Sequence, residues 1–354
     1  MKKAILLISL VIVLVVPNTI NINANTVNND PKEISLSFSG DILIHEALYN
    51  KAKTKKGYNF DPQLIKLKPY LDNDLDICHL ETPLTNRDPK TYPIFATPYQ
   101  IAETLQSVGF EGCSIASNHS LDQGEKGLIY TKKILLENNL KASGTRINKK
   151  DQSFAHYKLR DINITHMSYT YSTNGISNTN KLVNSPINVN NIIKEAERFR
   201  KEGSDLVILS LHFGNEYQIT PSDYQKQVIN KLTKKHPFDI IVGHHAHVAQ
   251  PAEIVNGTPV FYGLGNLLSG QGGKGKENRQ WGVLLTLKLS KEQNKYVINQ
   301  VNPIPVIVDQ KTFTATPVTT IDQKHYLAKP AQAATKSTKK LYENLFNQLA
   351  LRQP

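Results

Sequence analysis

Six short apolar segments in this chain each stop at glycine, asparagine, histidine or acidic residues. They are Ile34–Ser39, Leu75–His79, Cys113–Ser117, Leu206–Leu211, Ile240–Val242 and Pro259–Tyr262. Helical periodicity is expected between them, at Pro98–Ser107, Gly124–Asn138, Asn190–Lys201 and Ser222–Lys235. Strands that alternate with helices form a largely parallel sheet, which binds ligands beyond the carboxyl ends of its strands. The pattern therefore predicts an α/β fold whose polar residues converge on one edge.

The later part of the chain departs from this alternation. Gly282–Leu289 and Tyr296–Val308 are strands without an intervening helix, which indicates an antiparallel extension or a second sheet. Ser172–Asn184 is rich in polar residues and is interpreted as a loop near the site that could act as a lid. Ser269–Arg279 carries four glycines with Lys274 and Lys276. We favour a flexible hairpin tip for this segment over a flap that contacts anions.

Both ends of the chain are expected to lie outside the main domain, placed at residues 33–310. Residues 1–25 begin with two lysines and an apolar run from Ala4 to Val16, as in a secretory signal peptide or a signal-anchor. We therefore expect the protein outside the cytoplasm, secreted or held at the outer face of the membrane if the segment is not cleaved. Residues 311–354 form a C-terminal extension, where Leu341, Leu345 and Leu349 predict an amphipathic helix.

The composition favours an anionic partner. Forty-two basic residues against 30 acidic residues give a net charge of +12, so the surface attracts anions in general. We find neither an aromatic and basic stripe nor a helix-turn-helix pattern, and we expect no nucleic-acid partner. A cell-wall polymer, a polyanionic capsule or an anionic membrane face suits the charge as well.

The cysteine content excludes a disulfide framework and a cysteine zinc site, because only Cys78 and Cys113 occur. Both lie in strand-like segments. Side chains within parallel strands rarely have bridging geometry, so we expect two small core residues rather than one disulfide.

Histidine is concentrated at the end of one apolar segment. Three of the eleven histidines follow Ile240–Val242 as His244, His245 and His247, which favours a metal or phosphate-type site over solvated loop residues. A divalent metal also needs carboxylate and amide oxygens. The ends of the other strands supply them, and the full ligand set is Asp41, Glu81, Asn118, His212, His245 and His247.

Each of these residues alone has an ordinary structural explanation. Asp41 could cap a helix, Glu81 could pair with Arg87, and Asn118 could turn the chain. Six such residues at successive strand ends favour two metal ions that share one site. His119, beside Asn118, is then free to protonate a leaving group.

Six motifs in order resemble the CapA family of poly-gamma-glutamate capsule synthesis proteins, which is related to the calcineurin-like metallophosphoesterases. The motifs are Gly40-Asp41, Leu80-Glu81-Thr82-Pro83, Asn118-His119 with Asp122-Gln123-Gly124, His212-Phe213-Gly214-Asn215-Glu216, Gly243-His244-His245-Ala246-His247-Val248 with Gln250-Pro251, and Tyr262-Gly263-Leu264-Gly265-Asn266. The resemblance covers about Ile34 to Val308. It implies a four-layer α/β sandwich of the metallophosphoesterase type, with two mixed sheets flanked by helices.

By the same resemblance, the six ligands hold two divalent metal ions, of manganese, zinc or iron, and His119 is the catalytic histidine. The implied partners are an anionic polymer such as poly-gamma-glutamate and subunits of a membrane synthase. Additional candidates for the site are His45, His244, Glu216 and Asn266.

Several positions depart from the family pattern. The first motif of active metallophosphoesterases is Asp-x-His, whereas Leu43 stands at that spacing here and the next histidine is His45. Glu81 replaces an aspartate, Ser117 an asparagine and Ala246 a proline. The missing histidine puts one metal position in question. Alternation from His247 favours His245 over His244 as the residue that faces the metal.

Three functions compete. The first is an exported accessory protein in the synthesis, export or processing of the polymer. The second is a general extracytoplasmic phosphodiesterase or phosphatase, and the third is a non-catalytic subunit that binds polymer or assembles the synthase. No Walker-type loop is present, which argues against the polymer ligase itself, and the lack of a Gly-x-Ser-x-Gly motif argues against a serine hydrolase.

Overall fold

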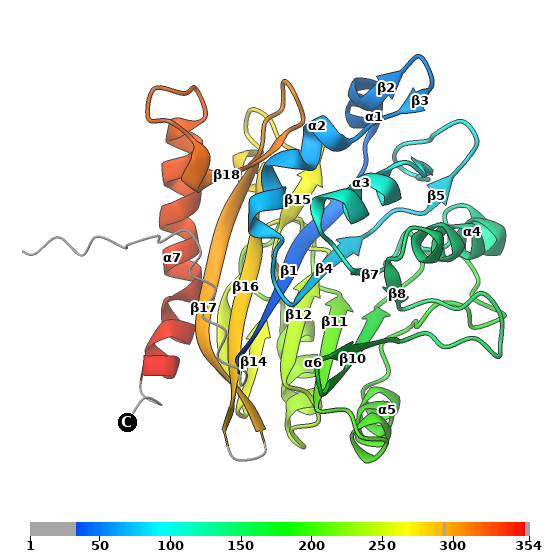
Figure 1. The fold of residues 1–354 in the computed structure, drawn as a ribbon, viewed down its shortest axis with the longest axis vertical. Coiled ribbons are helices and arrows are strands. Elements are labelled where there is room, and N and C mark those ends of the chain that lie inside the picture. Colours follow the sequence, from blue (N-terminus) through cyan, green and yellow to red (C-terminus); the bar gives the residue numbers. More distant parts are fainter. Residues whose placement is uncertain (1–32, 293–294, 351–354) are drawn as a thin grey trace, which may run out of the picture. The chain divides into compact units, whose positions relative to one another are not determined.

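Two β-sheets face each other across a shared apolar core, and helices cover their outer faces (Figure 1). The computed structural model describes residues 33–292 and 295–350. The predicted export segment, residues 1–25, lies outside them.

The first sheet combines a parallel half with an antiparallel half. Its order is β18-β17-β16-β1-β4-β7-β8, and β15 also pairs with β1. The strands are β1 (Glu33–Leu43), β4 (Leu75–Leu80), β7 (Gly112–Ser114), β8 (Lys141–Ser143), β15 (Asn266–Ser269), β16 (Trp281–Glu292), β17 (Lys295–Val308) and β18 (Ala315–Pro317). β1, β4, β7, β8 and β15 pair in parallel, whereas β16 to β18 are antiparallel. The two late strands thus extend this sheet.

The second sheet has the order β13-β14-β12-β11-β10-β9. Its strands are β9 (Ala155–Leu159), β10 (Ile162–Thr170), β11 (Leu206–His212), β12 (Ile240–His244), β13 (Ala252–Val255) and β14 (Thr258–Phe261). The four central strands are parallel, and β9 and β13 are antiparallel edges. Both sheets are mixed, as the resemblance implied.

Three apolar clusters define four layers. Residues of both sheets, such as Phe38, Ile77, Ile208 and Val242, pack together in the central cluster. The helices on the first sheet are α1 (Glu46–Ala52), α2 (Asp61–Leu64), η1 (Ile65–Tyr70), α3 (Ile101–Val108) and α4 (Gly124–Glu137), and those on the second are α5 (Val189–Lys201) and α6 (Asp223–Thr233). The order helix, sheet, sheet, helix is the predicted sandwich.

The four predicted helices are confirmed as α3, α4, α5 and α6, with ends displaced by a few residues. Their start signals are visible in the sequence. Asn188 caps α5 by accepting from the amide of Asn191, and Ser222 forms a capping box with Gln225 at α6.

A long C-terminal helix, α7 (Ala328–Ala350), lies along one side of the sandwich (Figure 1). Its apolar face contributes the buried side chains of Tyr342 and Leu345 to the central cluster, with Leu341 and Leu349 partly buried beside them. The predicted amphipathic helix is confirmed and completes the core. No helix in the described ranges is both long and apolar enough to cross a membrane.

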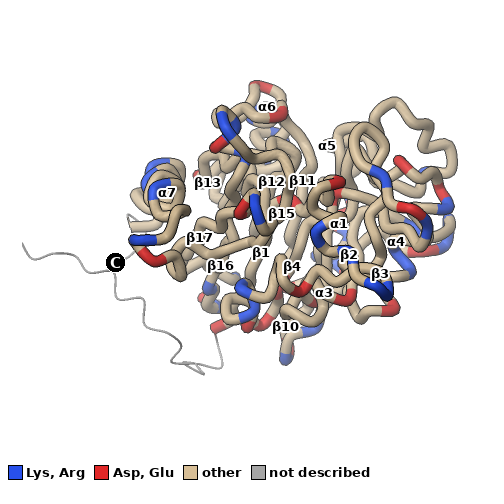
Figure 2. Tube along the Cα trace, turned by 90° about the horizontal axis from the view of Figure 1, so that it is seen from above, with Lys and Arg blue, Asp and Glu red and all other residues tan. Residues whose placement is uncertain are grey.

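The remaining elements are short. They are β2 (Lys53–Thr54), β3 (Gly57–Tyr58), β5 (Leu84–Thr85), β6 (Thr97–Pro98), η2 (Glu277–Arg279) and η3 (Val318–Thr320). The β2-β3 hairpin follows β1, and Lys51, Lys53, Lys55 and Lys56 around it are all exposed. Seen from above, basic and acidic residues are interspersed over the molecule, with several lysines around α1, β2 and β3 (Figure 2).

The prediction of two unlinked core cysteines is wrong. Cys78 in β4 and Cys113 in β7 form a disulfide. The two residues are direct partners in the parallel register, and their Cα atoms lie 4.4 Å apart, at the short end of the range that a bridge tolerates. This pairing depends on how two distant strands align, which the local sequence does not determine.

Candidate metal centre

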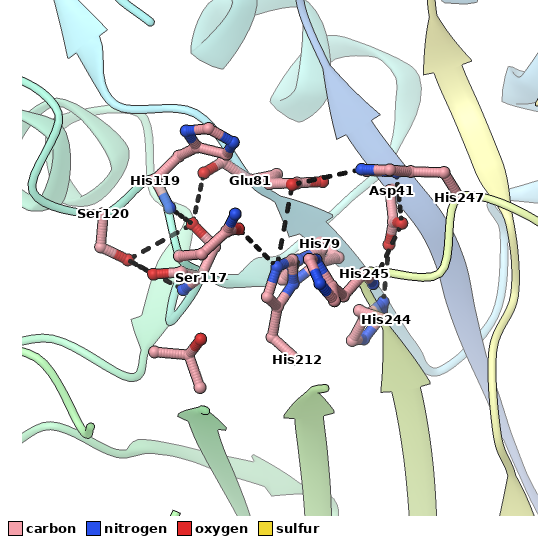
Figure 3. A network of polar contacts seen from close by, with 12 residues as sticks. Asp41, His79, Glu81, Ser117, His119, Ser120, His212, His244, His245 and His247 are labelled. Carbon is pink, nitrogen blue, oxygen red and sulfur yellow. Dashed lines mark hydrogen bonds and ion pairs between the residues drawn. The ribbon is translucent and has the colours of Figure 1, made fainter. Parts of the chain in front are cut away.

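The predicted ligands meet where the carboxyl ends of the two sheets lie side by side. Asp41 comes from β1, Glu81 follows β4, Asn118 follows β7, and His212 ends β11. Residues 244–247 continue β12 into a turn. All six predicted ligands are buried, with at most 4% of the surface of any of them exposed. The strands of both sheets thus deliver their polar ends to one point (Figure 3).

Close backbone packing brings the strand ends together. A Cβ atom at Gly40 would lie 2.3 Å from the carbonyl oxygen of Gly265, and one at Gly243 would lie 1.9 Å from that of Tyr262. Only glycine fits at either place. These two glycines therefore set the position of Asp41 and His244, the residues that follow them.

Four of the ligands form one half of the centre: Glu81, Asn118, His212 and His245. His212 Nε2 lies 2.8 Å from Asn118 Oδ1 and 3.7 Å from Glu81 Oε1. His245 offers a ring nitrogen to the group that Glu81 and His247 complete, in which all the potential ligand atoms lie within 4.8 Å of one another. Glu81 is the carboxylate common to both halves.

The other half is built around Asp41. One oxygen, Oδ1, lies 3.2 Å from His244 Nδ1, and the other, Oδ2, lies 3.1 Å from His247 Nδ1. The backbone amide of His245 also donates to Asp41 Oδ2, at 3.2 Å. His247 Nε2 points the other way and lies 3.6 Å from Glu81 Oε1. His247 therefore links the two carboxylates.

The turn that carries the histidines has an unusual backbone. His245 and His247 adopt positive φ angles of 87° and 56°, which non-glycine residues rarely do. The carbonyl of Ala246 between them accepts from the amide of Tyr217 at 2.7 Å. This conformation lets both His245 and His247 reach the same side, and the mainchain bond to Tyr217 holds the turn in place.

Burial and mutual charge perturb the pKa values of the ligands. Burial raises the pKa of Glu81 to about 7, against the opposing charge of His247. Burial also raises the pKa of Asp41, but the bonds to His244 and His247 outweigh it and hold the pKa well below its usual range. Burial and the charge of His247 lower the pKa of His245 to about 3. Neutral imidazole and ionised carboxylate are the forms that bind metals.

The residues present fit a divalent metal. Glu81 Oε1, Glu81 Oε2 and His245 Nδ1 are buried without any hydrogen-bond partner in the described part of the chain. Leaving such groups unsatisfied costs about 1–3 kcal/mol each, and more for a charged one. A cation held by Glu81, Asn118, His212 and His245 would satisfy all three atoms with oxygen and nitrogen donors that such metals accept.

A buried histidine that we did not predict lies directly beneath the centre. His79 Nε2 is 3.0 Å from His212 Nδ1, its Nδ1 is 2.8 Å from Ser114 Oγ, and its ring stacks on His244 at 3.9 Å. Two face-to-face rings cannot both direct lone pairs at one ion, and both nitrogens of His79 have other partners. His79 thus orients His212: with a metal at Nε2 of His212, His79 Nε2 would accept the proton on Nδ1 of that ring.

His119 lies at the rim of the centre, beside the edge of the Phe95 ring. Its Nδ1 lies 2.7 Å from Asp122 Oδ2, which leaves Nε2 available to a substrate. Burial lowers the pKa of His119, but the bond to Asp122 and the charge of Glu81 raise it by more, so the net pKa lies above its usual value.

The predicted lid loop contacts this rim. Asn174 has a positive φ of 50°, and its side-chain nitrogen lies 3.4 Å from His119 Nδ1. Its Oδ1 accepts from the side-chain nitrogen of Asn118 at 3.2 Å. The loop prediction for Ser172–Asn184 is confirmed for its position near the site. Closure of a lid stays a prediction.

The four additional candidates occupy different places. Asn266 Oδ1 lies 3.1 Å from His247 Nδ1, so it orients that ring. His244 faces Asp41. His45 belongs to none of the ligand groups within the described residues, and its Nδ1 accepts from the amide of Gly270 at 3.2 Å. Glu216 is exposed near the mouth of the site.

Comparison with curated proteins shows two relatives. The chain is 29% identical over 257 residues to the PGA biosynthesis protein CapA of Bacillus subtilis (strain 168), covering 68% of this chain and 64% of that protein. It is 25% identical over 258 residues to the capsule biosynthesis protein CapA of Bacillus anthracis, covering 69% and 62%. The matches therefore span less than two thirds of the length of either relative.

Among solved structures, the chain is similar to the calcineurin-like phosphoesterase YfkN from Bacillus subtilis, with 12% identity and a TM-score of 0.47 over 90% of this chain and 98% of that one. The family model described as "Bacterial capsule synthesis protein PGA_cap" matches residues 35–271, which hold every predicted ligand and His119. The chain belongs to the PGA_cap family of bacterial capsule synthesis proteins.

Proposed function

We propose that this protein acts outside the cytoplasm in the synthesis, export or processing of poly-gamma-glutamate or a related anionic polymer, through a site that holds two divalent metal ions. The observation that carries the proposal is the set of six buried ligands from two sheets, in which both oxygens of Glu81 lack a partner. The names of the two relatives support the capsule role.

The metal ions, when bound, would polarise a scissile group and lower the pKa of a bound water. The chain supplies the rest of the chemistry. Asp122 holds His119 by Nδ1, so a proton on Nε2 can be given to a leaving group. Asn174 contacts this rim, with its side-chain nitrogen 3.4 Å from His119 Nδ1.

Two features support export and an anionic partner. Disulfides persist in oxidising compartments, and Cys78 and Cys113 form one in the core of the first sheet. The lysines of the β2-β3 hairpin, exposed after the strand that carries Asp41, raise the local concentration of a polyanion. Proteolysis of intact cells tests the location: the protein should be degraded without lysis.

Metal content tests the site directly. The purified chain, exposed to manganese, zinc or iron, should contain about two metals at saturation by elemental analysis. The Asp41→Ala and His245→Ala variants should each contain fewer. A folded parent chain without metal would contradict the proposal and leave a binding or assembly protein on a metallophosphoesterase-like fold.

Two assays then separate the competing functions. A change in the length of poly-gamma-glutamate, followed by size-exclusion chromatography, supports processing of the polymer. Turnover of bis(p-nitrophenyl) phosphate without any change in the polymer would favour a general phosphodiesterase. Polymer binding that persists in a chelator, without turnover of either compound, would favour a non-catalytic subunit.

A further inference from the structure

The glycine-rich segment 270–279, here called the flap, is tied to the metal centre rather than forming a free hairpin tip. The amide of Gly270 donates to His45 Nδ1 at 3.2 Å, and Gln271 Nε2 donates to the Tyr217 hydroxyl at 3.3 Å. Asn266 Nδ2 donates to Gln271 Oε1 at 3.2 Å and to the Arg279 carbonyl at 2.8 Å. The flap is therefore anchored at both ends.

Within residues 33–292 and 295–350, no group forms a hydrogen bond or an ion pair with the guanidinium group of Arg279, at the end of the flap. Its Cζ lies 3.3 Å from the centre of the Tyr217 ring, so the planar group is stacked and oriented. Its Nε is buried and makes no hydrogen bond in the described part of the chain. Glu277, two residues earlier, accepts from the amide of Gly275 instead. An oriented, unpaired arginine is suited to an anion from outside the chain.

Tyr217 and Asn266 place this guanidinium beside the metal centre. The Tyr217 ring lies 6.1 Å from the His247 ring, so the distance from Arg279 Cζ to His247 cannot exceed the sum of 6.1 and 3.3 Å. Asn266 joins the same two residues, through its Oδ1 near His247 Nδ1 and its Nδ2 on the Arg279 carbonyl. A ligand at the metals would therefore have its next anionic group within reach of Arg279.

We propose that Arg279 is a specificity residue that binds a carboxylate of the polymer adjacent to the unit held at the metal centre. The planar guanidinium matches a carboxylate with two parallel hydrogen bonds, which the flexible Lys274 and Lys276 at the flap tip cannot provide. This inference rests on the proposed function for the identity of the polymer. A phosphate would use the same fork, and the experiment separates the two anions.

Binding of labelled poly-gamma-glutamate and of polyphosphate to the metal-loaded full chain, at physiological salt, tests the proposal. The Arg279→Gln variant should bind poly-gamma-glutamate about tenfold more weakly or worse, since it loses a charge-assisted pair. The matched control is Lys276→Gln, which removes the same charge from an exposed position in the flap and should weaken binding by less than about twofold.

Melting temperature and metal content establish that Arg279→Gln is folded, and Tyr217→Ala, which removes the stacking partner, should weaken binding in the same direction. Equal effects of Arg279→Gln and Lys276→Gln would overturn the inference, because only general charge would then matter. A parent chain that binds no poly-gamma-glutamate would refute the proposed function. Polyphosphate binding that alone depends on Arg279 would overturn the choice of carboxylate.

Discussion

The two carboxylates of the candidate metal centre differ in their hydrogen-bond donors. Asp41 has close donors at both oxygens, from the rings of His244 and His247 and the amide of His245. Glu81 has none, although its side chain is as deeply buried. The Asp41 half also has Leu43 at the position where an Asp-x-His motif would have its histidine, whereas the Glu81 half has Asn118, His212 and His245.

For the two proposed metal ions, this difference predicts unequal affinities. The hydrogen bonds that satisfy Asp41 must be rearranged before a cation can bind there, and that costs free energy. At Glu81 a cation displaces no hydrogen bond of the carboxylate, although it must separate His212 from Asn118, and it neutralises a buried charge to which the described residues donate no hydrogen bond. We therefore expect a tight position at Glu81, Asn118, His212 and His245, and a weaker one at Asp41, His247 and the shared Glu81.

The largest effect should follow from removing the shared carboxylate. Glu81→Gln keeps the shape but loses the charge common to both positions, so both metal affinities should fall by on the order of 100-fold or more. His245→Ala should abolish the tight step only, and Asp41→Asn the weak step only. Calorimetric metal titrations measure the steps. The control Glu103→Gln changes an exposed glutamate on α3 and should leave both steps unchanged. If His245→Ala and Asp41→Asn weaken the same binding steps equally, the two halves do not hold metals of different affinity.

The same two carboxylates should have opposite effects on stability when no metal is bound. At pH 8 in a chelator, Glu81→Gln should raise the free energy of unfolding by about 1–3 kcal/mol, because it removes a buried charge that accepts no hydrogen bond from the described residues. Asp41→Asn should lower it by a similar ~2 kcal/mol, because one of the two accepting oxygens becomes an NH2 group, so that the side chain can no longer accept at both positions, from His244 and from His247. Urea unfolding measures both. Changes of the same sign would mean that Asp41 is not satisfied by its neighbours.

The fold and the convergence of the candidate ligands could be predicted because they depend on local patterns. Apolar runs that stop at polar residues predict the strand ends that carry Asp41, Asn118 and His212. Parallel topology then brings these ends together. Helix caps such as Ser222 mark their elements equally well. None of this requires knowledge of contacts between distant strands.

The features that were missed depend on such contacts or on a second layer of residues. The Cys78–Cys113 disulfide follows from the register of β4 with β7. β10 was not predicted, although it is a central strand. His79 could have been predicted, because it precedes Glu81 by two positions and residues at that spacing share a face of the strand. What it orients, His212, belongs to the other sheet and could not be inferred.

Metal affinity at the tight position should depend on the hydrogen bond of His79 to His212 more than on the volume of the His79 side chain. His79→Leu removes the acceptor for His212 Nδ1 and should weaken the tight metal step by about tenfold, as the loss of an outer-shell partner typically does. His79→Asn provides an amide oxygen and should recover most of the affinity. The control His166→Asn alters another fully buried histidine, bonded to Ser210, and should leave the step unchanged. Equal losses in His79→Leu and His79→Asn would leave His79 as a packing residue.

The smallest effect concerns a carboxyl pair at the opposite end of β4, which must be separated from the metal centre in any pH titration. Burial raises the pKa of Glu111 to about 7, with its oxygen accepting from the amide of Asp76, whose own pKa burial also raises. A carboxyl group with a raised folded pKa favours the protonated native state. Its penalty is therefore absent below about pH 4.5 and complete above about pH 7.

Glu111→Gln should accordingly stabilise the metal-free chain at pH 8 and have little effect at pH 4. Glu111 is exposed as a residue and only its carboxylate is partly buried, against the amide of Asp76, so solvent screening should limit the gain to less than about 1 kcal/mol. Thermal melts of this variant across the range, beside Glu81→Gln, assign the pH dependence to one end of β4 or the other. If Glu111→Gln leaves the profile unchanged, the destabilisation at high pH comes from Glu81 rather than from Glu111.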